Sequence, residues 1–165
     1  MSPDPYPAVR LGFNPTKPTS EGWISLKSSD PFESPKFIGN YFSKEEDKKV
    51  MISGMHLMRK FLKTKAMRDI VDEELSPGPD FNDDKSFMDF ARSEGGTVFH
   101  QCGTCRMGKD ISSSVVDESL KVHGIDGLRV VDASIFPRIT TGNTNAPSIM
   151  VGEKAADIIL AEQKI

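Results

Sequence analysis

Prolines and glycines divide this chain into short segments, and that division restricts its possible folds more than any other feature. There are 11 prolines and 13 glycines among 165 residues. Each proline removes a backbone donor and fixes one backbone angle, while glycine permits turns that other residues avoid. Five of the prolines fall within the first 18 residues, so residues 1–20 are predicted to form an extended leader. The rest is about one domain in length.

Apolar residues at helical spacing mark the helices. Methionines recur at intervals of four and three along residues 51–58, which is the pattern of one helix face. We therefore predict a long helix over residues 44–63, beginning with a capping box formed by Ser43 and Glu46. Shorter helices and a final one are predicted over residues 65–74, 83–92 and 147–162.

Short apolar runs bounded by turn residues predict strands. The clearest run follows Gly22 and covers residues 23–26, and a second extended stretch covers residues 36–42. Residues 115–116 and 128–131 have the same pattern. Strands and helices do not alternate strictly, so we expect an α+β fold, or a piece of a larger α/β protein.

Composition excludes several classes of protein. Hydrophobic residues make up 37% of the chain and the mean hydropathy is -0.37, which fits neither a disordered chain nor a membrane protein. No apolar run approaches the ~18 residues of a membrane span. A formal net charge of -3 without a long block of like charges predicts no nucleic-acid partner. The chain starts without the pattern of a secretory signal and has two cysteines, so a reducing, cytoplasmic location is expected.

The densest group of reactive side chains lies around His100. Cys102 and Cys105 follow it, so three soft ligands fall within six residues, as in a zinc or dithiol site. Structural zinc normally takes a second, separate pair of ligands, and the sequence offers none nearby. A cysteine nucleophile paired with His100 is another alternative. In the last alternative His100 is a general base, because imidazole exchanges protons near neutral pH.

A second polar segment, residues 139–147, favours the general-base alternative. It joins a predicted strand to the start of the last helix and is rich in amide and hydroxyl groups. A helix start presents free backbone N–H groups and a positive dipole, which suit an electron-rich ligand atom. Thr141, Thr144 and Asn145 can also serve there as turn and cap residues, and that role is compatible with ligand contact.

The order and spacing of residues in these two segments resemble the C-terminal part of the glucose–methanol–choline (GMC) flavoprotein oxidoreductases, choline-dehydrogenase-like members above all. Further matches lie before and between the two segments, from about residue 10 onward. The matching runs include His100-x-x-Gly103-Thr104-Cys105-Arg106-Met107-Gly108, Gly127-Leu128-Arg129-Val130-x-Asp132-x-Ser134-x-x-Pro137 and Gly142-Asn143-Thr144-Asn145-Ala146-Pro147.

The resemblance implies an FAD-dependent oxidoreductase acting on alcohols, in which a hydride passes from the substrate carbon to N5 of the flavin. His100 matches the active-site histidine that takes the hydroxyl proton or holds the developing alkoxide. Asn143 matches a second active-site position, and its amide can donate a hydrogen bond but cannot act as a base. The resemblance thus makes His100 the base of this pair.

The resemblance also implies which residues meet the cofactor and the substrate. Gln101 and Cys102 occupy positions that vary within the family, so they are expected to line the substrate pocket. Cys105 is expected to have no part in the reaction and to pack within a tight turn. The positions that match the family's flavin contacts are Asp132, Ala133, Asn143, Thr144, Asn145, Ala146 and Pro147.

By the same resemblance, residues 21–114 form part of a substrate-binding domain, an antiparallel sheet backed by helices. Residues 115–165 return to the FAD-binding domain with a strand and the last helix. The family's phosphate-binding turn, Gly-x-Gly-x-x-Gly, is missing from the chain. We therefore expect an N-terminal FAD-binding half as partner, on the same precursor or a separate chain. The alternatives are a non-catalytic binding module and a hydroxynitrile-lyase-type relative.

Overall fold

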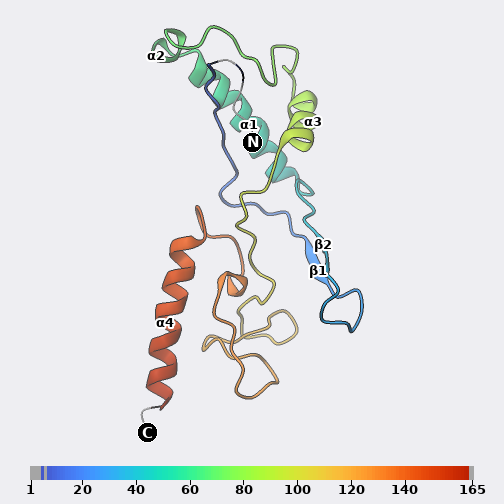
Figure 1. Ribbon diagram of the computed structural model, residues 1–165, viewed down its shortest axis with the longest axis vertical. Coiled ribbons are helices and arrows are strands. Elements are labelled where there is room, and N and C mark those ends of the chain that lie inside the picture. The colour runs from blue at the N-terminus through green and yellow to red at the C-terminus, as the bar shows by residue number, and fades with distance from the viewer. Residues whose placement is uncertain (1–4, 6, 164–165) are drawn as a thin grey trace. The chain divides into compact units, whose positions relative to one another are not determined.

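The computed structural model describes residues 5 and 7–163 of the chain (Figure 1). These residues form a mixed fold of four α-helices and one small antiparallel sheet. The strands are β1 (Trp23–Ser25) and β2 (Lys36–Ile38). The helices are α1 (Glu45–Leu62), α2 (Lys65–Arg68), α3 (Asp84–Glu94) and α4 (Asn145–Gln163), with a short 3-10 helix, η1 (Ala133–Ile135).

The chain divides into two compact units, each made of two stretches of sequence. The first unit comprises Met1–Pro15 and Phe42–Gly96, and the second comprises Thr16–Tyr41 and Thr97–Ile165. The boundaries of these compact units differ in kind from those of the predicted domains, because they reflect contacts within this chain alone. The division into a leader, a substrate-domain portion and an FAD-domain segment at residues 20 and 114 stays a prediction.

In the first unit α1 and α3 lie side by side (Figure 1). The buried apolar side chains of this unit, Phe87, Met88 and Ala91, all come from α3. The predicted helices over residues 44–63 and 83–92 are confirmed to within two residues at each end. Both predictions rested on local periodicity, which a helix satisfies by itself.

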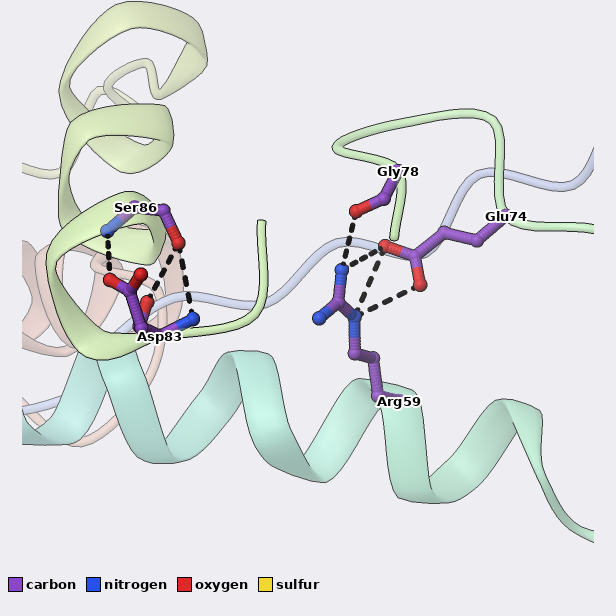
Figure 2. Close-up of polar contacts among 5 residues, drawn as sticks. All are labelled: Arg59, Glu74, Gly78, Asp83 and Ser86. Atoms are coloured by element: carbon purple, nitrogen blue, oxygen red, sulfur yellow. Dashed lines mark hydrogen bonds and ion pairs between the residues drawn. The ribbon is translucent and has the colours of Figure 1, made fainter. Parts of the chain in front are cut away.

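The start of α3 carries a capping box, shown in Figure 2. The Ser86 backbone N–H donates to Asp83 Oδ1 (2.8 Å), and the Asp83 backbone N–H donates to Ser86 Oγ (3.2 Å). The capping box predicted for Ser43 and Glu46 was wrong, because α1 begins after Lys44, whose side chain makes no capping hydrogen bond. Three acidic residues in the first turn of α1 complement the helix dipole instead.

A second polar contact lies in the loop that follows Arg68, where the predicted helix over residues 65–74 ends early. Arg59 of α1 pairs with both carboxylate oxygens of Glu74 through one guanidinium edge, with Nη2–Oε1 and Nε–Oε2 distances of 2.8 and 2.9 Å (Figure 2). The same Nη2 donates to the Gly78 carbonyl oxygen (2.8 Å). These bonds tie Glu74 and Gly78 of the loop after Arg68 to α1.

The second unit contains the β1–β2 hairpin, in which Trp23 pairs with Ile38 and Ser25 with Lys36. The two predicted strands are therefore confirmed, although each is three residues long. The strands predicted at residues 115–116 and 128–131 were wrong as regular elements, because these segments form isolated bridges only. Tight turns between them, with φ of +75° at both Gly124 and Gly127, leave too little length for a ladder.

The core of the second unit lies between the loops after residue 100 and one face of α4. The predicted helix over residues 147–162 is confirmed and starts slightly earlier, at Asn145. Glu162 near its end pairs with Arg129 (2.6 Å) and Lys121 (3.0 Å), which ties α4 to those loops. The buried side chains of this core are Val116, Leu120, Ile135, Phe136, Val151 and Ala155. Of the described residues, none belongs to a helix long and apolar enough to cross a bilayer.

Candidate active site

The segment that begins at His100 lies alongside η1. Within this segment Gly103 has a φ of +89° that favours glycine, and a Cβ there would lie 3.2 Å from the Phe136 carbonyl oxygen, directly after η1. Two segments that stand out separately in the sequence are therefore joined in space. The joining bonds run from Cys105 N to Ser134 O (3.0 Å) and from Met107 N to Ile135 O (2.8 Å).

His100 itself contacts the start of α4. Its Nδ1 lies 3.0 Å from Thr144 Oγ1, and the Thr144 backbone N–H donates to the same nitrogen over 3.4 Å. Thr144 is 7% exposed. Its carbonyl oxygen accepts the first helical bond, from Ser148 N (2.9 Å), so Thr144 is the N-cap residue of α4. The contact brings the predicted base to the polar segment before the last helix.

The Thr144 contacts decide which ring nitrogen can meet a substrate. Nδ1 is engaged by Thr144, so Nε2 of His100 is the nitrogen left for another partner. The Thr144 hydroxyl can donate to Nδ1 or accept from it, whereas the backbone N–H can only donate. Whether neutral His100 carries its hydrogen on Nδ1 or on Nε2 therefore depends on whether the Thr144 hydroxyl or the Thr144 backbone N–H interacts more strongly with Nδ1.

The turn before α4 is open to a ligand. Asn143, Asn145 and Ala146 are exposed, and Asn145 and Ala146 begin the helix, where backbone N–H groups have no partner within the helix. Pro147 lacks an N–H, so its place in the first turn costs no hydrogen bond. The structure thus offers amide donors at the positions predicted to approach a cofactor.

Asp132 and Ala133 lie at the start of η1. The exposed Asp132 carboxylate accepts a hydrogen bond from Ser134 N (2.7 Å), so its contact is local to the turn. The Ser134 hydroxyl is buried without a hydrogen-bond partner among the described residues. An unsatisfied buried hydroxyl costs about 1–3 kcal/mol, so Ser134 Oγ is a group that a bound molecule or further chain would stabilise.

Two residues that the sequence analysis missed contact the predicted pocket residue Gln101. Gln101 Nε2 donates to Tyr41 Oη (2.9 Å) and to Thr97 Oγ1 (2.6 Å). Tyr41 is separated from Gln101 by 60 positions, so no local pattern could have indicated it. Thr97 lies four residues before Gln101, and threonine is a common turn residue because its hydroxyl bonds nearby backbone N–H groups, so the sequence offers a signal for the turn.

The cysteines fit a packing role. Cys102 is half-buried and packs on the core of the second unit, and burial raises the pKa of its thiol against the opposing effect of Arg106. A raised pKa keeps the sulfur protonated, which disfavours a thiolate nucleophile. Cys102 and Cys105 are both free thiols. No three His, Cys, Asp or Glu side chains within the described ranges gather closely enough to hold a metal ion.

Comparisons with known proteins agree on one family. Residues 18–152 match the family model of GMC oxidoreductases. The chain is 41% identical, over 94% of its length, to the oxygen-dependent choline dehydrogenase of Staphylococcus xylosus. A fungal aryl-alcohol oxidase superposes with a TM-score of 0.81 at 34% identity over 89% of the chain. The formate oxidase of Aspergillus oryzae, in a study of its FAD modification, superposes with a TM-score of 0.78 at 37% identity over 87% of the chain.

All three relatives are much longer than this chain. It covers 28% of the choline dehydrogenase, 24% of the aryl-alcohol oxidase and 25% of the formate oxidase. The similarity therefore includes the fold and the residues of the C-terminal quarter that the chain spans. The activities of the whole relatives belong to those proteins.

Proposed function

Because this chain belongs to the GMC oxidoreductase family, we propose that it is the C-terminal portion of an FAD-dependent alcohol dehydrogenase or oxidase. The observation that carries the proposal is the contact between His100 and Thr144 at the start of α4. Asn143 directly precedes Thr144 in the sequence, so we propose that its amide donates at the same site where His100 acts as the acid–base group. This pair suits the removal of a proton from an alcohol.

In this proposal the substrate hydroxyl lies at Nε2 of His100. His100 takes the hydroxyl proton, which makes the neighbouring carbon a better hydride donor, and such a group is typically worth about 100- to 10,000-fold in rate. Asn143 donates a hydrogen bond to the same oxygen as negative charge develops. When bound, FAD supplies the hydride acceptor, N5 of the flavin ring.

The base role requires one tautomer of His100. A proton can be accepted at Nε2 only if the neutral ring carries its hydrogen on Nδ1, and the Thr144 hydroxyl at 3.0 Å can accept that hydrogen. The Thr144 backbone N–H, at 3.4 Å, favours the opposite tautomer. With the hydrogen on Nε2, neutral His100 would donate to the substrate oxygen instead. The ring ¹⁵N chemical shifts distinguish the two tautomers and so test this step directly.

The residues present fit the flavin ring but not the whole cofactor. The exposed residues Asn143, Asn145 and Ala146 around the start of α4 are groups that a bound ring system could contact. The ADP half has no Gly-x-Gly-x-x-Gly turn in this sequence to hold it. The proposal therefore includes an N-terminal FAD-binding half as the partner, and an α/β domain of that half as the place where α4 packs.

A chimera tests the proposal. The last 28% of the Staphylococcus xylosus choline dehydrogenase is replaced by this chain, so that the relative supplies the missing half. The purified chimera is expected to be yellow, and its flavin absorbance to bleach anaerobically when an alcohol is added. Choline and an aryl alcohol head the substrate panel, because the relatives are named for these classes.

Variants of the chimera distinguish a loss of proton transfer from a loss of folding or flavin binding. His100→Ala is expected to slow bleaching by at least about 100-fold. His56→Ala is the matched control, because His56 is an exposed residue of α1 that packs edge-on against Phe87. A His100→Ala chimera that bleaches as fast as its parent would remove the base from the proposal. A colourless, folded parent chimera would remove the enzyme assignment.

A second candidate is a binding module without catalysis. This candidate predicts a stable 165-residue protein that binds neither FAD nor a complementing half. Co-purification with an N-terminal half decides between the two functions.

A further inference from the structure

The side chain of Gln101 is held from two directions. Its Nε2 donates to Tyr41 Oη over 2.9 Å and to Thr97 Oγ1 over 2.6 Å. An amide nitrogen carries two hydrogens, so these two bonds use both of them. Gln101 directly follows His100 in the sequence and is the residue expected to line the substrate pocket.

Thr97 holds this turn through a second bond as well. Its Oγ1 also accepts the Phe99 backbone N–H over 3.0 Å. Phe99 has a φ of +60°, which bulky residues rarely adopt, and its side chain is 81% exposed, so side-chain burial does not explain this backbone. One hydroxyl oxygen therefore supports both the unusual backbone before His100 and the side chain after it.

Tyr41 is fixed in turn by its own surroundings. Its ring covers Gly39, where a Cβ would lie 2.5 Å from Tyr41 Cε2. The intervening Asn40 adopts a φ of +51° and donates from Nδ2 to the Glu21 carbonyl oxygen (2.8 Å). Glu21 also pairs with Arg106 (3.6 Å) on the far side of the His100 turn. The segment after β2 thus contacts the His100 segment directly through Tyr41 and indirectly through Glu21, within one compact unit.

We propose that Tyr41 and Thr97 are positioning residues that hold the Gln101 side chain beside His100 and thereby set which substrates the site accepts. The proposal rests on the proposed function, in which His100 meets the substrate. Neither residue touches the reacting atoms in this scheme. Tyr41 acts from the segment that follows β2, and Thr97 from within the turn itself.

The first measurement needs no cofactor. In the ¹⁵N-labelled 165-residue chain, exchange of the Gln101 side-chain amide protons with water is measured by NMR, with Gln101→Ala to assign the signals. Tyr41→Phe removes one acceptor and Thr97→Val the other, so each is expected to speed the exchange about 2- to 10-fold, the effect of one hydrogen bond. Thr97→Ser keeps the hydroxyl and is expected to restore the parent rate.

The second measurement uses the flavin-loaded chimera. Tyr41→Phe and Thr97→Val are expected to raise KM for the best alcohol by about 2- to 10-fold with kcat changed less, and Thr97→Ser to restore KM. Thr64→Val is the matched control, because Thr64 precedes α2 and its side chain makes no capping hydrogen bond. Residues that merely support the fold are not expected to change KM more than kcat. They are also not expected to regain the parent KM when Thr97 is replaced by serine.

The outcomes of the two measurements are separable. Unchanged amide exchange in both variants would overturn the proposal whether or not the chimera is active. Unchanged KM in an active chimera would overturn it as well. An inactive parent chimera contradicts the proposed function alone, and the exchange rates then decide whether Tyr41 and Thr97 hold Gln101.

Discussion

At the scale of single residues, Thr144 has two functions, since it caps α4 and contacts the predicted base. Thr144→Val removes the hydroxyl but keeps the backbone N–H, which donates to His100 Nδ1. We expect the ¹⁵N shifts of His100 to move toward the tautomer with its hydrogen on Nε2. Flavin bleaching in the chimera should slow by about 10-fold, the effect of one hydrogen bond to a group that becomes charged.

Thr144→Ser provides the control for this prediction. Serine caps helices as well as threonine does and keeps the hydroxyl that accepts from Nδ1. The serine variant should therefore match the parent in both the tautomer and the bleaching rate. If valine leaves both unchanged, the Thr144 hydroxyl has no part in positioning the proton.

At the scale of elements, the cap of α3 predicts a pH dependence of stability. The Ser86 backbone N–H bonded to Asp83 lowers the pKa of that carboxyl below its usual value. Asp83 thus stabilises the folded state at pH values above the unfolded pKa of about 3.9, and this contribution is lost as the pH falls through the lower folded pKa. Unfolding midpoints measured by circular dichroism between pH 6 and 3 test this.

Asp83→Asn is the matched variant for the pH prediction. Asparagine caps helices about as well as aspartate but does not titrate in this range. The difference in stability between parent and variant should therefore shrink toward low pH. A difference that stays constant from pH 6 to 3 would show that the charge on Asp83 contributes nothing to the cap.

At the scale of the whole molecule, large apolar side chains remain exposed. Phe32 is 94% and Leu26 83% exposed in the hairpin loop, and Ile149 is 60% exposed on α4. Contiguous patches of such side chains are typical of surfaces that another part of a protein covers. We expect the 165-residue chain to bind the dye ANS, and the chimera to bind less of it per mole. Equal fluorescence from both would contradict this expectation.

The helices and strands that could be predicted are those that depend on residues close together in the sequence. Helix α1 and helix α4 follow from local periodicity and from a proline that suits a first turn. The strand predicted over residues 23–26 and the extended stretch over residues 36–42 also appear, and the structure pairs them as a short hairpin. The bridges around Val116 could not be told from strands, because the same apolar residues serve either arrangement.

Contacts between distant residues could not be predicted in this way. His100 and Thr144 are 44 positions apart, and Gln101 and Tyr41 are 60 apart. Between His100 and Thr144 the chain passes through glycines with positive φ such as Gly103, and between Tyr41 and Gln101 it includes helices α1 to α3. The sequence therefore identified His100 and Thr144 as residues of interest, and the structure shows that they touch.

The double use of Thr144 affects how this part of the protein can evolve. A replacement at position 144 must suit a helix start, a buried site and an imidazole partner at the same time. Its neighbours Asn145 and Ala146 are exposed and meet fewer demands within this chain. Mutational drift should therefore be slowest at position 144, and a change in the chemistry of this site would be coupled to a change in how α4 begins.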